Sequence, residues 1–93
     1  MTIDVALAGE IDVATVAEVK DKLTGAIEAN PGETVRVDLT EVEFLDSTGL
    51  GVLVGALRRA RTAGGGIILA GARPNVAKVF QITGLDKVFE IEA

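Results

Sequence analysis

The feature of this sequence that most limits its fold is a regular alternation between two kinds of apolar pattern. Short apolar runs typical of β-strands occur at residues 3–7, 35–39, 67–70 and 88–91. Between them lie three stretches whose apolar residues recur every three or four positions, as on one face of a helix. Strands joined through helices form a largely parallel sheet with right-handed crossovers. The sequence therefore predicts one α/β domain over residues 1–93, in βαβαβαβ order, with about four strands and three helices.

The boundaries of these patterns fall at proline and glycine residues. Residues 30–32, Asn-Pro-Gly, end the first helical stretch, because proline cannot continue a helix. Three glycines at residues 64–66 stop the second stretch. Pro74 suits the first turn of the third helix, and Gly84 is expected to be its left-handed cap. Residues 67–70 show no alternation, which predicts a strand that is buried on both faces.

The expected core is mainly aliphatic, since aromatic residues make up only 3 % of the chain. The three phenylalanines, Phe44, Phe80 and Phe89, are expected to add to it. Residues 40–46 are interpreted as a connection that plugs the core through Val42, Phe44 and Leu45. The predicted buried stripe of the second helix consists of Leu50, Leu53, Val54, Leu57 and Ala60.

Composition excludes several classes of function. The net charge of −5 disfavours DNA or RNA as a partner, because an acidic surface repels phosphate backbones. The absence of both cysteine and histidine excludes thiolate chemistry, zinc sites and most pairs of nucleophile and base. No apolar run reaches about 18 residues, so no membrane span is predicted. The first residues also lack the basic region of a signal peptide. We therefore expect a soluble, cytoplasmic protein.

The segment Asp46-Ser47-Thr48-Gly49-Leu50 at the expected start of the second helix is the most informative part of the sequence. A hydroxyl there lies beside free backbone N–H groups and the positive end of the helix dipole, an environment that tolerates a phosphate. Gly49 would remove a side chain next to the Ser47 hydroxyl and let another protein approach. Serine is also a common N-cap, so spacing alone favours a Ser47 that only caps the helix. The residues leave both interpretations open.

Two other patterns in the second helix have simpler explanations. Gly49, Gly51 and Gly55 form G-x-G-x-x-x-G, which is one residue off the dinucleotide-binding fingerprint. No strand leads into it at the right distance, so we interpret these glycines as letting the helix pack closely against the sheet. Residues 58–61 include three arginines near the end of the helix, where the dipole favours cations. They are compatible with an anion patch or with a solvated helix end.

Acidic residues gather near the predicted strand ends and loops, and paired carboxylates can perform acid–base chemistry. The sequence supplies no oxyanion partner, metal ligand or cofactor-binding pattern to accompany them. We therefore expect no catalytic residue, no cofactor and no metal site. An enzyme that uses these carboxylates, or that binds a nucleotide, is the alternative from a different class. The acids concerned are Glu10, Asp12, Glu41, Glu43 and Asp46.

Three segments, in this order along the chain, carry a resemblance to a known family. They read GEID at residues 9–12, VDLTEVEFLDSTGLGVLVGALRRA at residues 37–60 and FQITGLDKVF at residues 80–89. Together they resemble the STAS domain, named for sulfate transporters and anti-sigma factor antagonists, over nearly the whole chain. Within that family the sequence is most similar to the bacterial anti-sigma factor antagonists.

This resemblance implies a function and a site. In such proteins a serine at the position of Ser47 is phosphorylated by an anti-sigma factor that is also an ATP-dependent serine kinase. The unphosphorylated form binds the anti-sigma factor and frees the sigma factor, and the phosphorylated form does not bind. The resemblance thus implies that Ser47 is the phosphoacceptor and that an anti-sigma factor kinase is the partner. The expected partner-binding residues are Asp12, Asp46, Ser47, Thr48, Gly49 and Leu50.

The sequence departs from many relatives at its two ends. It lacks their extra N-terminal edge strand and their additional C-terminal helix, and an exposed sheet edge can pair with another chain. We therefore expect a monomer or a weak homodimer. The alternative within the same family is a constitutive STAS subunit of a larger assembly, such as a lipid-transport or stress-signalling complex, which lacks the phosphorylation switch.

Overall fold

The predicted alternation of strands and helices is present in the computed structural model, which describes residues 1–92. The elements follow the predicted βαβαβαβ order, with one additional short 3₁₀ helix, η1, before the last strand. Their bounds are β1 Thr2–Ile11, α1 Val16–Ala29, β2 Thr34–Leu45, α2 Ser47–Thr62, β3 Gly66–Ala70, α3 Pro74–Thr83, η1 Leu85–Lys87 and β4 Glu90–Glu92.

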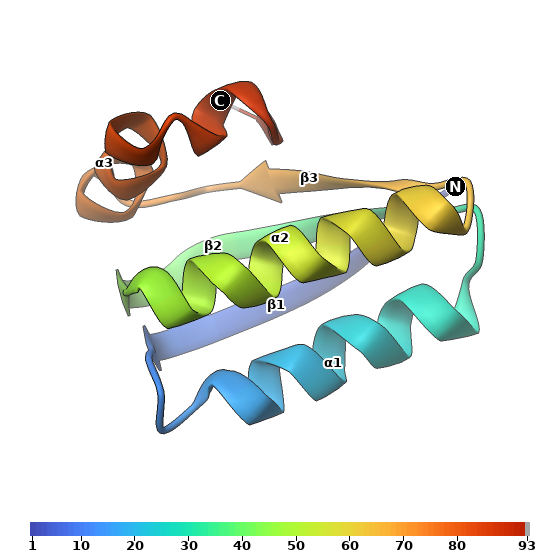
Figure 1. Ribbon diagram of the computed structural model, residues 1–93, viewed down its shortest axis with the longest axis horizontal. Coiled ribbons are helices and arrows are strands. Elements are labelled where there is room, and N and C mark those ends of the chain that lie inside the picture. Colours follow the sequence, from blue (N-terminus) through green and yellow to red (C-terminus); the bar gives the residue numbers. More distant parts are fainter. Residues whose placement is uncertain (93) are drawn as a thin grey trace.

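The strands form one parallel sheet in the order β1-β2-β3-β4. Helices α1 and α2 lie next to each other along one face of this sheet (Figure 1). Strands in sequential order, connected by right-handed crossovers, place successive helices on the same face. The opposite face of the sheet is therefore left without the cover of α1 and α2. Among residues 1–92, no helix combines the length and apolar character that a bilayer crossing requires.

The face of the sheet that α1 and α2 leave uncovered carries charged side chains, contrary to the expected burial of residues 67–70 on both faces. A row of paired residues across the four strands consists of Asp4, Arg36, Ile68 and Glu90. Three of these four side chains are charged, which is typical of a solvated face. Ile68 belongs to this row and is only half-buried, while its neighbours in β3 are buried. The prediction that residues 67–70 are buried on both faces is therefore wrong, because α1 and α2 cover only one face.

The strand β2 is longer than predicted, because it continues through residues 40–45 of the segment 40–46, which was expected to form a connection. Val42 and Leu45 are buried, as predicted. Phe44 is 48 % exposed, so its prediction as a core residue is wrong. The reason is a register shift between β1 and β2 near this end. Such an irregularity breaks the strict alternation of inward and outward side chains.

The rest of the core is close to the prediction. The rings of Phe80 and Phe89 are buried and meet edge to face, with their centroids 5.8 Å apart. Four of the five residues in the predicted stripe of α2 are buried. The fifth, Val54, is half-buried and packs at the edge of the core, whereas Ala56 is buried instead. The core is mainly aliphatic, as expected from the composition.

The ends of α3 follow their sequence signals. The helix begins at Pro74, and Gly84 ends it in the left-handed conformation with φ of 75°, as predicted. The last strand starts at Glu90, two residues after the predicted start at residue 88. The short helix η1 occupies part of the segment before it. This short helix was not predicted from the sequence.

Gly49 allows α2 to approach the sheet closely. A Cβ atom at this position would contact a methyl group of Leu45 and would lie 2.8 Å from Cγ2 of Ile11. At Gly51 and Gly55 a Cβ would meet no heavy atom within 4 Å, and both residues are exposed. The packing role predicted for the three glycines therefore applies to Gly49 alone. The surface role expected for Gly49 beside Ser47 is not supported, because Gly49 is buried.

The packing of α2 makes a prediction for Leu53, which is completely buried. Leu53→Ala should lower the free energy of unfolding by about 2–5 kcal/mol, because apolar contacts are lost and a cavity remains. Urea denaturation measures this change. Ile82→Ala on α3 is the control, since Ile82 is 74 % exposed, and its effect should stay within about 0.5 kcal/mol. A comparably small loss for Leu53→Ala would mean that α2 packs through another face.

Replacing the glycines of α2 by alanine should change the free energy of unfolding in opposite directions at different positions. Gly49→Ala should lower the free energy of unfolding by about 1–3 kcal/mol, because the new methyl group overlaps its neighbours. Gly51→Ala and Gly55→Ala should each raise it by about 0.5–1 kcal/mol, because alanine is the better helix former and has room. Urea denaturation of the three variants provides the measurement. Three effects of the same sign would contradict the assigned faces of α2.

Candidate functional site

The candidate site lies at the edge of the sheet where β1 and β2 end beside each other. Ile11 and Leu45 are paired across the two strands, and the backbone N–H of Asp46 donates to the carbonyl of Ile11 at 3.2 Å. Asp12 and Asp46 therefore follow paired residues, and Ser47 begins α2 directly afterwards. The carboxyl ends of parallel strands are where α/β proteins commonly bind their ligands and partners.

Asp46 is the residue that caps α2. Its carboxylate oxygen Oδ1 accepts a hydrogen bond from the backbone N–H of Gly49 at 3.1 Å. Its carbonyl oxygen accepts the first bond of the helix from the N–H of Leu50 at 3.0 Å. This geometry is that of an N-cap, which supplies a partner for one of the free N–H groups of the first turn. The interpretation of Ser47 as the cap is therefore wrong.

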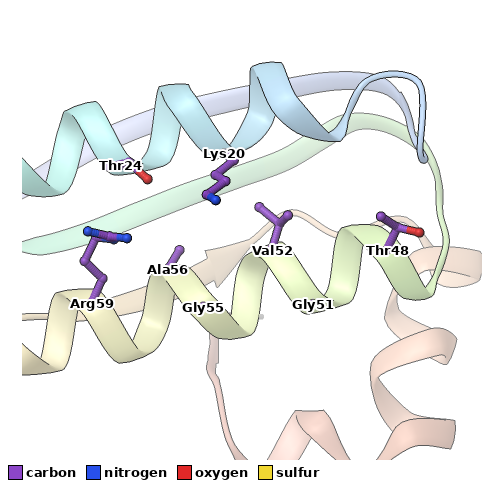
Figure 2. Close-up of a pocket in the computed structure, with 8 residues that line it drawn as sticks. All are labelled: Lys20, Thr24, Thr48, Gly51, Val52, Gly55, Ala56 and Arg59. Atoms are coloured by element: carbon purple, nitrogen blue, oxygen red, sulfur yellow. The ribbon is translucent and has the colours of Figure 1, made fainter.

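Ser47 is the first residue of α2, and its side chain is exposed, as predicted. Within residues 1–92, its hydroxyl makes no hydrogen bond. The hydroxyl is thus on the surface, close to the positive end of the helix dipole, and is free of the structural task that Asp46 performs. Thr48, the neighbouring hydroxyl, is also exposed and belongs to the wall of a cavity between α1 and α2 (Figure 2).

Asp12 shapes the turn between β1 and α1. Its oxygen Oδ1 accepts a hydrogen bond from the N–H of Ala14 at 2.9 Å. Its own N–H donates to the hydroxyl oxygen of Thr15 at 3.1 Å, and that hydroxyl donates to the carbonyl of Glu10 at 2.7 Å. Asp12 is half-buried in this network. The structure therefore gives it a local role in the turn and places it at the same edge as Ser47.

Two of the residues expected to contact a partner lie in the core. Gly49 is buried, and only 7 % of Leu50 is exposed. Both face the sheet, because α2 turns this side toward the ends of β1 and β2. The other four predicted residues have accessible surface at the edge: Asp12 and Asp46 are half-buried, and Ser47 and Thr48 are exposed.

Sequence reasoning missed two exposed apolar residues at this edge. Val13, in the turn after Asp12, is 78 % exposed, and Phe44 is 48 % exposed. Val13 comes directly after the GEID segment and lies outside the predicted strand at residues 3–7, and this position was an available signal for its exposure. No signal was available for Phe44, since the apolar residues nearest to it in the sequence, Val42 and Leu45, are both buried. Contiguous apolar patches rimmed by polar residues mark protein-binding surfaces, whereas single exposed apolar residues are ordinary.

The charges of this edge are mainly acidic. Glu10, Glu41 and Glu43 are exposed near the ends of β1 and β2. The side chain of Glu41 lies 3.7 Å from the guanidinium group of Arg73. Among the described residues, no three acidic side chains gather as a metal site would require. The edge thus presents carboxylates and a free hydroxyl, without an arrangement for metal chemistry.

The ionisable groups with shifted pKa values lie away from this edge, on the exposed face of the sheet. The hydrogen bond from Arg36 to Glu92, 2.7 Å from Nη2 to Oε1, raises the pKa of Arg36 and lowers that of Glu92. Hydrogen bonds from Thr40 lower the pKa of Asp38. These shifts favour the charged forms of surface groups, so they indicate ion pairing rather than a catalytic acid or base.

Comparisons with known proteins agree with this fold. The chain is 42 % identical to an anti-sigma-B factor antagonist from Listeria monocytogenes over 90 residues, which cover 97 % of this chain and 78 % of that protein. The anti-sigma factor antagonist SpoIIAA in its unphosphorylated form has a similar structure, with a TM-score of 0.81, 30 % identity and coverage of 99 % and 80 % of the two chains.

SpoIIAA from Bacillus in its phosphorylated form is also similar, with a TM-score of 0.71 and 29 % identity, and the match covers 99 % of this chain and 83 % of that one. The family model described as the STAS domain matches residues 2–93. With this match and the four-stranded parallel sheet, the chain belongs to the STAS domain family.

Proposed function

We propose that this chain is a cytoplasmic anti-sigma factor antagonist whose binding is switched by phosphorylation of Ser47. In this proposal the partner is an anti-sigma factor with serine-kinase activity, which binds at the edge around the start of α2. The observation that carries the proposal is the exposed hydroxyl of Ser47, which is free because Asp46 caps the helix. The names of the relatives support it, since those proteins are anti-sigma factor antagonists.

Anti-sigma factor antagonists are regulatory binding proteins rather than enzymes, and this chain fits that class. In the proposed scheme it is a substrate of its partner's kinase activity and contributes no catalytic group. One of the similar solved structures is that of a phosphorylated antagonist, which supports a regulatory phosphorylation in this fold.

Phosphorylation of Ser47 would act on binding and leave the fold intact. A phosphoserine carries about −1.5 to −2 charges at neutral pH. The first turn of a helix accommodates this charge, because its free N–H groups and dipole attract anions. The Asp46 cap bonds to Gly49 and does not depend on the Ser47 side chain. The new charge would therefore be added to a stable helix start.

The same charge would weaken an interface formed around Ser47. Asp12 and Asp46 already place carboxylates at this edge, and a phosphate would raise its negative potential further. A partner surface shaped for a neutral hydroxyl would have to desolvate the phosphate without a matching cation. In this proposal Val13 and Phe44 supply the apolar contacts, and Asp12, Asp46 and Thr48 the polar ones.

Substitutions at Ser47 test this proposal. Ser47→Ala should bind the purified anti-sigma factor with nearly the affinity of the wild type and should resist phosphorylation. Ser47→Asp should fold as the wild type but bind at least about 10-fold more weakly, which corresponds to about 1.4 kcal/mol. Isothermal titration calorimetry measures the affinities, and mass spectrometry after incubation with ATP locates the phosphate.

Thr48→Ala is the matched control, because Thr48 carries the adjacent exposed hydroxyl. It should still be phosphorylated at Ser47. If Ser47→Asp bound as tightly as the wild type, or if no phosphate formed on Ser47, the switch would be refuted and a constitutive STAS subunit would be the better description.

A further inference from the structure

A cavity of about 330 Å³ lies between α1 and α2, and Thr48 of the candidate site belongs to its wall. Figure 2 shows Lys20 projecting into it from α1, and Arg59 projecting from α2 toward Thr24. Its walls include Lys20 and Thr24 of α1 and Thr48, Gly51, Gly55 and Arg59 of α2. Because Thr48 follows Ser47, one end of the cavity opens beside the proposed phosphorylation site.

A second cavity, of about 580 Å³, adjoins the first, since both have Gly55 and Arg59 in their walls. It continues along α2 to Ala63 and also borders Arg58. We name the two cavities together the α1–α2 groove. From Thr48 to Ala63 the rise of an α-helix gives a length of about 22 Å. An extended peptide of about six or seven residues spans this distance.

The α1–α2 groove is basic, although the whole chain has a net charge of −5. Lys20, Arg58 and Arg59 stand along its walls. One acid, Glu28, also borders the second cavity, and its carboxylate lies 3.7 Å from the guanidinium group of Arg59. Both side chains of this pair are more than half exposed. A solvent-exposed ion pair of this kind is weak and can be exchanged for another acidic partner.

Gly51 and Gly55 keep the groove open. Neither glycine is required by packing, because a Cβ atom at either position would meet no heavy atom within 4 Å. Glycine is unfavourable in the middle of a helix compared with alanine. Their lack of side chains exposes the backbone of α2 as the floor of the groove, between the cations on its walls.

We propose that the α1–α2 groove binds an extended acidic segment of the partner protein. This inference rests on the proposed function, in which that partner contacts Ser47 at the open end of the groove. The distribution of cations over both cavities fits several carboxylates along a chain, whereas a compact anion would occupy only one cavity. A phosphate on Ser47 would also repel an acidic segment at the point where it enters the groove, which links the groove to the switch.

Nuclear magnetic resonance titration tests the groove without the partner. The probe is a synthetic glutamate peptide of about six residues, chosen from the length of the groove. We expect saturable shifts of the Gly51 and Gly55 amide signals of the ¹⁵N-labelled protein. The shifts should vanish near 1 M salt, where the Debye length is about 3 Å. No shift at these amides would overturn the proposal, as would inorganic pyrophosphate displacing the peptide and giving the same shifts.

Two pairs of variants separate the groove from the overall charge. The double variant Lys20→Glu and Arg59→Glu should abolish the peptide shifts, whereas Lys78→Glu with Lys87→Glu, an equal charge change at exposed residues elsewhere, should keep them. Gly55→Leu should weaken binding by filling the groove. Gly25→Leu is its control, because Gly25 lies on α1 outside both cavities and has equal room for a side chain. The proposal would be overturned if the two double variants had equal effects, or if Gly55→Leu and Gly25→Leu had equal effects.

Titration of the purified anti-sigma factor distinguishes this inference from the proposed function. We expect the Lys20→Glu and Arg59→Glu double variant to bind at least about 10-fold more weakly than the wild type. If the anti-sigma factor bound both proteins equally, the groove proposal would fail and the proposed function would stand. If it did not bind the wild type at all, the proposed function would fail, and with it the assignment of the groove to this partner.

Discussion

The close contact between the first turn of α2 and the ends of β1 and β2 determines most of what this domain can do. The N–H of Asp46 bonds to the carbonyl of Ile11, and Gly49 lets the helix backbone lie against Ile11 and Leu45. Leu50 is then directed into the core. A larger side chain at Gly49 would push the helix away from the sheet. The position of Ser47 at the sheet edge is therefore a consequence of packing two residues further along the helix.

The first residues of α2 divide structural and surface tasks between neighbours. Asp46 supplies the cap, Gly49 and Leu50 supply the packing, and Ser47 and Thr48 face solvent. A residue that neither caps nor packs can change its charge with little effect on folding. This arrangement is what a reversible modification requires, since it must alter binding while the domain stays folded. The α1–α2 groove extends the same surface along the other side of Thr48.

Sequence patterns predicted what depends on local chemistry. The element order, the Pro74 start, the left-handed Gly84 and the buried position of Leu53 follow from signals within a few residues, and the structure confirms them. The position of Ser47 at the start of a helix was also predictable. Its proposed role came from the resemblance to a family, because spacing alone favoured a cap. Asp46, Ser47 and Thr48 can all cap a helix, and which of them does so depends on where β2 ends.

The remaining features depend on distant parts of the chain. The exposure of Phe44 results from a register shift between β1 and β2, which a pattern within β2 cannot show. The exposure of Ile68 depends on which face of the sheet α1 and α2 cover. The groove exists only because α1 brings Lys20 opposite Gly51 and Gly55. The glycines are visible in the sequence, but that they face α1 could be assigned only once the two helices were placed side by side.

Asp46 holds the start of α2, and Ser47 has no structural task there. Urea denaturation of Asp46→Ala and Ser47→Ala separates these two roles. We expect Asp46→Ala to lower the free energy of unfolding by about 0.5–2 kcal/mol, because the cap of α2 is removed. We expect Ser47→Ala, which removes only an exposed hydroxyl, to change it by less than about 0.5 kcal/mol. An equal loss for both variants would show that Ser47 also supports the helix start.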